Sequence, residues 1–277
     1  MRHRGKAPQR CFFFVCRLTR LRTRTTLDTV FITLASALAG FIDASVGGGG
    51  LVLVPALFAA YPNVSPATLL GANKSASVWG TMFAAWRFQQ QMSLQWRALR
   101  VGALCALLGA CAGAFTLTLL SPQLMRQALP LLLLAVLIYT LKNKQMGQAH
   151  QPRYSDRVQM WAMGGCGAVM GFYDGFFGPG TGSLLVFLLV RILGFDFLQA
   201  SAHSKVLNLA SNMAALLWLG WQGHVLWAIF LPMALANIAG SWLGTRVALR
   251  QGAGYVRWLF ILVVSALLLK TARDAFL

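Results

Sequence analysis

The chain of 277 residues is 57% hydrophobic and only 11% charged, and its mean hydropathy is +0.63. These values exceed what a water-soluble domain needs to form a core, and the hydrophobic residues come in long blocks, which excludes an ordinary soluble α/β or all-β fold. The sequence therefore predicts an integral membrane protein with the lipid bilayer as a partner.

The charge balance also narrows the function. The chain carries 24 Lys and Arg against six acidic residues, a net charge of +18. In a soluble protein this excess would suggest nucleic-acid binding, but here the basic residues lie at the ends of hydrophobic blocks, as the positive-inside rule describes. The five cysteines form no CxxC motif, and no HExxH motif or other metal-ligand spacing is present. We therefore expect no nucleic acid, metal ion or cofactor to bind.

Residues 1–26 form a basic arm with eight Lys and Arg and no acidic residue. This composition predicts that the arm stays in the cytoplasm. A transit peptide and an over-extended start of the reading frame are the alternatives.

Two sets of hydrophobic blocks follow the arm, each block close to the roughly 20 residues that a helix needs to span a bilayer. They cover residues 27–60 with a glycine break, 67–86, 101–120 and 124–141, and then 158–190 with a second break, 198–219, 225–245 and 256–269. We assign transmembrane repeat 1 to residues 27–142, a basic linker to 143–157 and transmembrane repeat 2 to 158–277. The fold class is thus an all-α polytopic transmembrane bundle of about eight helices.

A single shift of 131 residues, without gaps, aligns the second set of hydrophobic blocks with the first. Asp43 and Asp174 are 131 positions apart, as are Lys74 and Lys205. The shared pattern is GF-x-D-x-x-x-G-x-G, and a G-x-x-x-G pair also recurs in each set. The sequence therefore predicts two homologous four-helix repeats, an arrangement typical of transporters.

Charge counting distinguishes parallel from inverted repeats. With four crossings per repeat, 17 basic residues lie on the side of the termini and 5 on the other, whereas five crossings per repeat divide them 11 and 11. The positive-inside rule then favours parallel repeats with both termini in the cytoplasm.

Four ionisable residues lie deep in hydrophobic blocks: Asp43, Lys74, Asp174 and Lys205. Each would cost about 2.5–3.5 kcal/mol if unpaired at the bilayer centre. One interpretation is a structural ion pair within each repeat, Asp43 with Lys74 and Asp174 with Lys205. The other is that they line a wet cavity, where the lysines bind substrate and the two aspartates carry a coupling proton.

The glycine breaks at 47–50 and 178–182 expose backbone that only protein or water can satisfy, so they predict a cavity. The helices that follow begin near Leu51 and Ser183 and would direct free N–H groups and positive dipole ends toward an anion. Close packing or a flexible hinge is the alternative. The binding residues assigned to the breaks are Gly49, Gly50, Gly180, Thr181, Gly182 and Ser183.

Polar residues at helical spacing follow each break. The stripe Lys74, Ser77 and Thr81 recurs as Lys205, Asn208 and Asn212, and Asn73 and His203 lie beside the two lysines. We assign Asn73, Ser77, Asn208, Asn212 and His203 to substrate binding together with the lysines. Hydrogen bonding between helices, or simple packing of the histidine, is the alternative.

An intramembrane hydrolase would need a nucleophile and a base, and Ser183 with His203 or His224 is the available combination. Ser183 lies in GTGSLL, which lacks the small turn residue of a G-x-S-x-G elbow. We therefore expect no enzymatic activity.

Four stretches resemble one family: GFIDASVGGGGLVLVPAL, GANKSASVWGTMFAAW, GFYDGFFGPGTGSLLVFLLV and QASAHSKVLNLASNMAAL. They are similar to the TauE/SafE sulfite exporter family, also called toluene-sulfonate uptake permeases, over about residues 27–273. The resemblance implies a bacterial inner-membrane permease for sulfite, sulfonates or related organosulfur anions.

The leading hypothesis is therefore an ion-coupled permease for a small sulfur-containing anion, which is its partner besides the bilayer, and a homo-oligomer is possible. A membrane-embedded scaffold protein with structural Asp–Lys pairs is the alternative. A channel is the third possibility.

Overall fold

The computed structural model describes residues 26–117, 134, 138 and 154–276. The arm, almost all of the block predicted at 124–141 and most of the linker lie outside these residues. The described part contains helices and no strand. In chain order its elements are α2 (Thr26–Val46), α3 (Gly50–Ala60), α4 (Pro66–Gln91), α5 (Trp96–Leu117), α7 (Asp156–Phe176), α8 (Thr181–Leu188), the π-helical turn η1 (Leu189–Leu193), α9 (Phe197–Trp221) and α10 (Trp227–Phe276). The all-α class is confirmed.

The helix ends follow from local sequence. Ser65 accepts a hydrogen bond from the Thr68 N–H at the start of α4, and Asp196 accepts one from the Gln199 N–H at the start of α9. Such caps satisfy N–H groups that have no acceptor within the helix. α10 is interrupted at Gly252, where φ is 74°, so it consists of a first segment, 227–251, and a second segment, 253–276.

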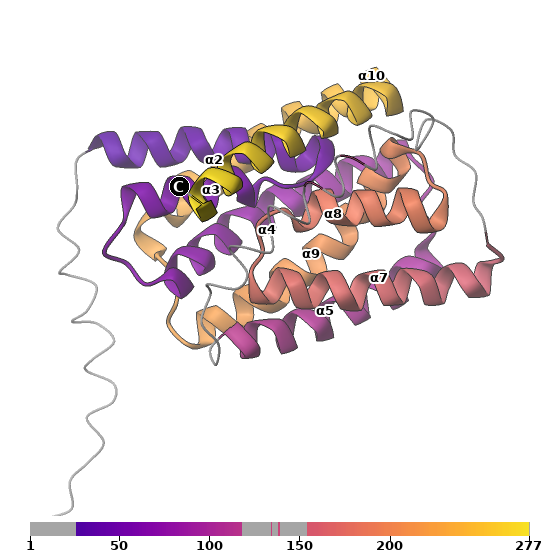
Figure 1. The fold of residues 1–277 in the computed structure, drawn as a ribbon, viewed down its shortest axis with the longest axis horizontal. Helices are drawn as coiled ribbons and strands as arrows, with labels where there is room; N and C mark the ends of the chain where they lie inside the picture. Colours follow the sequence, from indigo (N-terminus) through magenta and orange to yellow (C-terminus); the bar gives the residue numbers. More distant parts are fainter. Residues whose placement is uncertain (1–25, 118–133, 135–137, 139–153, 277) are drawn as a thin grey trace, which may run out of the picture.

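Both glycine breaks occur where the sequence predicted them, and at each the chain reverses. α3 runs back along α2, and α8 runs back along α7 (Figure 1). Each broken block is therefore a long helix followed by a short returning one, and not one interrupted crossing.

The two halves of the described chain run in opposite directions, so the prediction of parallel repeats is wrong. α2 begins at the left of Figure 1, whereas α7, its counterpart, begins at the right. The charge count favoured one crossing for each broken block over two. The chain reversal at each break means that a broken block does not carry the chain straight across, so the single-crossing count does not describe either half.

The closest helix contacts lie between the halves and recur at the same shift of 131. A Cβ atom on Gly240 or Gly244 of α10 would meet a backbone carbonyl of α2, and one on Gly109 or Gly113 of α5 would meet a carbonyl of α7. The carbonyls belong to Ala37 and Phe41 in α2 and to Ala168 and Phe172 in α7. These glycines let the backbones approach each other, as the G-x-x-x-G pairs predicted.

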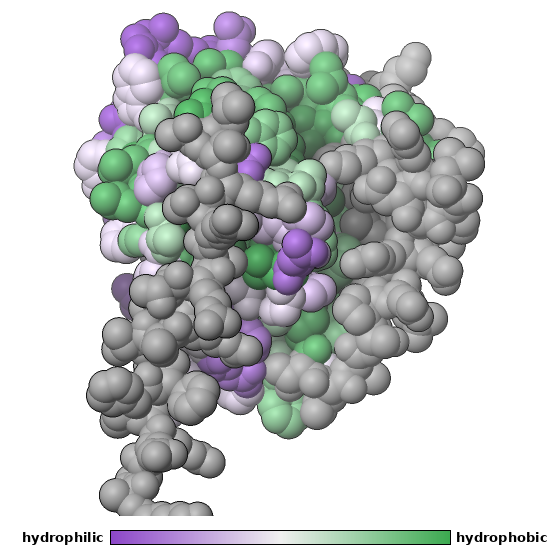
Figure 2. Space-filling view, turned by 90° about the vertical axis from the view of Figure 1, so that its left-hand side faces the viewer, coloured by the Kyte–Doolittle hydropathy of each residue, from purple (hydrophilic) through white to green (hydrophobic). Residues whose placement is uncertain are grey.

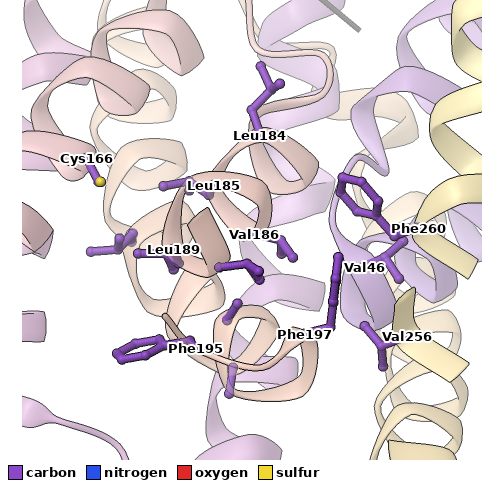
Figure 3. Close-up of a cluster of buried hydrophobic side chains, with 14 of the residues drawn as sticks. Val46, Cys166, Leu184, Leu185, Val186, Leu189, Phe195, Phe197, Val256 and Phe260 are labelled. Carbon is purple, nitrogen blue, oxygen red and sulfur yellow. The ribbon is translucent and has the colours of Figure 1, made fainter. Parts of the chain in front are cut away.

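As a result the helices form two bundles, each of which mixes the two halves. The first bundle contains α2, α3, α4 and the first segment of α10, and the second contains α5, α7, α8 and α9. The larger hydrophobic core surrounds α8, and the second segment of α10 packs against it through Val256 and Phe260 (Figure 3). α4 and α9 pack against each other where the two bundles meet.

The outward faces of the bundles are hydrophobic. Leu34, Leu108, Val169 and Leu217 are each about two-thirds exposed, whereas most of the described polar residues on α4 and α9 are buried. Three helical stretches, Asp28–Val46, Trp96–Leu117 and Trp227–Val263, are long and apolar enough to cross a membrane. At the end of the molecule where α2 begins, hydrophobic surface alternates with hydrophilic patches (Figure 2). Apolar exterior and polar interior together are the distribution expected in lipid.

Candidate functional site

The two glycine breaks touch each other near the centre of the molecule. Gly47 has a φ of +80°, and a Cβ atom there would lie 2.5 Å from the Ser183 nitrogen. On the other side, a Cβ atom on Gly182 would lie 2.7 Å from the Gly47 Cα. The Ser183 hydroxyl donates a hydrogen bond of 2.9 Å to the Gly47 carbonyl. The two backbones are therefore in direct contact, and a side chain at Gly47 or Gly182 would prevent this contact.

Two helices begin at this crossing. α3 starts at Gly50 and α8 at Thr181, close to the predicted starts at Leu51 and Ser183. N–H groups in the first turn of a helix have no acceptor within it and carry the positive end of the helix dipole. The Leu51 and Val52 N–H groups donate to the Gly48 and Gly49 carbonyls, and the Thr181 N–H donates to the Gly178 carbonyl. The Gly50 and Gly182 N–H groups are left as donors toward the space between the bundles.

The four intramembrane charges form two ion pairs. Lys74 Nζ lies 2.5 Å from Asp174 Oδ1, and Lys205 Nζ lies 3.5 Å from Asp43 Oδ2. Lys205 also donates a hydrogen bond to the Asp43 backbone carbonyl. Lys74, Asp174 and Lys205 are at most 3% exposed. Each lysine is thus neutralised in the interior.

The pairing within each repeat that one interpretation of the sequence assumed, Asp43 with Lys74 and Asp174 with Lys205, is wrong. Each pair instead joins one half to the other, because the crossed breaks place the end of α7 beside α4 and the end of α2 beside α9. A Cβ atom on Gly178, just after α7, would lie 3.2 Å from Lys74 Nζ. The two ion pairs also connect the first bundle to the second.

The two aspartates differ in their surroundings. The Thr81 hydroxyl donates a hydrogen bond of 3.1 Å to Asp43 Oδ2, so this oxygen has both Lys205 and Thr81 near it. Asp174 uses Oδ1 for Lys74, and its buried Oδ2 has no hydrogen-bond partner. The buried Asn73 Oδ1 likewise has none. Two buried acceptors in the described site are therefore unsatisfied.

These unsatisfied acceptors belong to residues that line one central cavity. The volume open to the centre of a water molecule is about 20 Å³, slightly above the 10–15 Å³ or so that one water requires. Asp43, Gly48, Gly50, Asn73, Lys74, Ser77, Asp174, Gly178, Gly180, Thr181, Gly182, Asn208 and Asn212 line it. The cavity has room for water, and an oxyanion requires the bundles to move apart.

Most of the predicted site residues are therefore brought together. Outside the cavity lining are Gly49, Ser183, Lys205 and His203. Gly49 packs against α2, and a Cβ atom there would lie 2.8 Å from the Cβ of Asp43. Gly48 and Gly178 also line the cavity and were not among the predicted binding residues, although both belong to the glycine runs. Tyr173 was not predicted either; its hydroxyl donates a hydrogen bond of 2.7 Å to the Pro179 carbonyl and supports the second break.

His203 is buried and faces away from this cavity. Its Nδ1 donates to the Gln199 carbonyl at 2.8 Å, and its Nε2 accepts from the Gln95 N–H at 3.2 Å. The ring packs on Phe195 with 4.7 Å between centroids. His203 thus attaches the turn between α4 and α5 to α9, and the structure gives it a packing role.

His203→Leu is accordingly expected to lower stability without changing substrate affinity. Loss of the ring leaves the part-buried Gln95 N–H without its acceptor, at a cost of about 1–3 kcal/mol, whereas the Gln199 carbonyl keeps its helical hydrogen bond in α9. Thermal unfolding in detergent micelles and the KM of transport measure the two effects. A raised KM with an unchanged unfolding temperature would instead indicate that His203 takes part in substrate binding.

Neither histidine considered as a base contacts Ser183. The His224 ring is hydrogen-bonded to the Thr68 hydroxyl at 3.1 Å, and the Ser183 hydroxyl donates to the Gly47 carbonyl.

Known proteins resemble this chain over most of its length. The family model described as "Sulfite exporter TauE/SafE" matches residues 32–271. "Probable membrane transporter protein YfcA" of Escherichia coli K12 is 33% identical over 240 residues, which cover 86% of this chain and 87% of the relative. "Probable membrane transporter protein ORF9" of Sinorhizobium sp. is 34% identical over 245 residues, or 88% of this chain and 92% of the relative. No solved structure matches the chain significantly.

The match covers both glycine breaks, both ion pairs and the cavity between them. A family model over residues 32–271 and relatives named as membrane transporters agree with the hydrophobic exterior and polar interior of the fold. This chain belongs to the TauE/SafE sulfite exporter family of membrane transporters.

Proposed function

We propose that the protein is an ion-coupled secondary transporter of small sulfur-containing anions, such as sulfite or sulfonates, in the bacterial inner membrane. One observation carries the proposal: the inverted halves gather a lysine, two helix starts and an unsatisfied carboxylate oxygen around one buried cavity. The lysine and the N–H groups suit an oxyanion. The carboxylate oxygen suits a proton.

Charge balance explains how anion and proton would be coupled. In the closed site two lysines are neutralised by two aspartates, so a bare anion would add an uncompensated charge to the interior, which is costly. Protonation of Asp174 at its unpartnered Oδ2 removes one negative charge and frees Lys74. The incoming anion then takes the place of the carboxylate beside Lys74, and the site stays neutral.

The same exchange loosens the contact between the bundles. The Lys74–Asp174 pair joins α4 of the first bundle to α7 of the second. Once Asp174 is protonated, the ionic part of this link is gone, and the bundles can rock apart around the crossed breaks. Movement of one bundle against another around a fixed central site is the usual form of alternating access.

Asp174→Asn provides the test, because asparagine mimics the protonated carboxyl group and cannot release a proton. In proteoliposomes given labelled sulfite or thiosulfate in the external buffer, we expect uptake driven by a pH gradient to fall at least tenfold in the variant. Exchange of internal for external anion at equal pH is expected to persist. Gradient-driven uptake at the wild-type rate would exclude Asp174 as the coupling group.

The substrate class has its own outcome in this experiment. Accumulation of label against its gradient distinguishes a carrier from a channel. If sulfite, thiosulfate and sulfonates all fail to move with the wild-type protein, the sulfur-anion proposal is wrong and the membership in a transporter family stands.

The scaffold alternative draws support from the same ion pairs, since both join one half of the chain to the other. It expects the pairs to act only as links, so that neutral replacement of both partners leaves function intact. The placement of both termini in the cytoplasm and a homo-oligomeric state remain predictions, and the first rests on the basic arm.

A further inference from the structure

A second pocket lies far from the central cavity, between the end of α4 and the first segment of α10. It has a volume of about 370 Å³ and is lined by Arg87, Gln91, Trp242, Arg246, Leu249 and Arg250. Arg87 is 13 positions beyond Lys74 on α4, which corresponds to about 20 Å along a helix. That distance exceeds the roughly 15 Å half-thickness of the hydrocarbon core. With Lys74 taken as the level of the bilayer centre, the pocket lies at the level of lipid headgroups.

Its charge is positive and uncompensated. Three of the six lining residues are arginines and none is acidic. In the described parts of the chain, the two ion pairs given for the interior involve none of these arginines. The Arg246 guanidinium lies 5.4 Å from the centre of the Trp242 ring, a cation–π contact that holds it in place. Three guanidinium groups with free donors match the oxygens of a phosphate.

The surface beside the pocket is apolar and exposed. Trp86 precedes Arg87 and is 50% exposed, and Leu243 follows Trp242 and is 48% exposed. Further toward the bilayer centre, Met82 and Leu235 are also exposed. A ligand that fits both features has an anionic phosphate at one end and hydrocarbon chains at the other.

We propose that this pocket binds the headgroup phosphate of an anionic phospholipid. The arginines contact the phosphodiester, and the acyl chains lie along the exposed faces of α4 and α10. Basic pockets between transmembrane helices are known to hold anionic headgroups in this way. The adjoining apolar surface favours a lipid over a free oxyanion, because a free oxyanion has no hydrocarbon part that could contact this surface.

The test compares two double variants that each remove two positive charges. Arg246→Gln/Arg250→Gln empties the pocket of two guanidinium groups, whereas Arg97→Gln/Arg100→Gln removes two arginines near the start of α5 that do not line it. Purified protein in micelles is mixed with phosphatidylglycerol, with phosphatidylcholine or with inorganic phosphate. Native mass spectrometry measures retained lipid, and the thermal midpoint measures stabilisation.

We expect the wild type and the Arg97/Arg100 variant to retain phosphatidylglycerol, and the Arg246/Arg250 variant to bind it at least tenfold more weakly. Phosphatidylcholine and inorganic phosphate should give no shift of the midpoint. Equal loss in both double variants would show a general charge effect and overturn the site. A shift of the midpoint with inorganic phosphate and none with phosphatidylglycerol would contradict lipid binding and indicate a site for a free anion.

Arg87→Gln provides a second variant if the double replacement fails to fold. It removes the α4 side of the pocket and is expected to weaken phosphatidylglycerol binding without affecting the helix contacts of α10. Unchanged lipid retention in this variant would also overturn the proposal.

Discussion

Lys74→Met is expected to lower the free energy of unfolding by about 3–5 kcal/mol, because it leaves the Asp174 carboxylate buried without its counter-ion. Asp174→Asn should cost a similar amount for the converse reason. The double variant should cost far less than the sum, since both buried charges are then gone. Unfolding in detergent micelles gives the three values needed for a double-mutant cycle.

The same cycle with Asp43 in place of Asp174 is the control. Asp43 is the partner within the same half that the sequence predicted for Lys74, but in the structure it pairs with Lys205. We expect a large interaction energy for Lys74 with Asp174 and a much smaller one for Lys74 with Asp43. The reverse ranking would show that the pairs form within each half.

Gly47→Ala is expected to destabilise the protein by about 2 kcal/mol or more and to abolish transport. The methyl group would stand in a left-handed conformation, which costs about 1–3 kcal/mol. It would also strike the backbone of Gly182 and Ser183, so the crossed breaks would have to separate. Membrane-inserted yield, thermal unfolding and anion uptake together measure the effect.

Gly165→Ala is the matched control for this variant. Gly165 lies on α7, where a Cβ atom meets nothing within 4 Å. In a helix the change from glycine to alanine is worth about 0.5–1 kcal/mol in favour of alanine. We therefore expect wild-type transport and equal or higher stability. An equal loss of stability and transport in both variants would contradict the close backbone contact at Gly47.

The composition of the site was largely predictable from the sequence. Charged and polar residues are rare in hydrophobic blocks, so their recurrence at one shift marks them as a set. Asn73, Ser77, Asn208 and Asn212 share a helical face with a lysine or lie next to one, and the structure places all four at the cavity. Helical periodicity determines which residues share a face, and the fold preserved those faces.

The partners across the cavity were not predictable in the same way. Periodicity places Lys74 on one face of α4, but it does not say which helix meets that face. Hydropathy cannot distinguish a helix that continues through a glycine break from one that turns back, because both give one long apolar block. That single ambiguity accounts for both the wrong direction of the repeats and the wrong ion pairs.

His203 shows a different limit of the sequence. It stands two positions before Lys205, and proximity along the chain suggested a shared site. Two residues along a helix differ by about 200° around its axis, so the histidine faces the turn at Gln95 while the lysine faces Asp43. The helical geometry that correctly grouped the polar stripe would have separated these two residues.

The mixed composition of the two bundles has a consequence for biosynthesis. During synthesis α2 leaves the ribosome long before α10, and Ser36 must wait for an acceptor, the Met233 carbonyl, that lies 197 residues further along the chain. Until then the Ser36 hydroxyl and the face of α2 that meets α10 have no partner in the chain made so far, although α3 and α4 already pack on other parts of α2. The first bundle, although its helices α2–α4 are inserted first, is therefore completed only after α9 has completed the second, when α10 has entered the membrane.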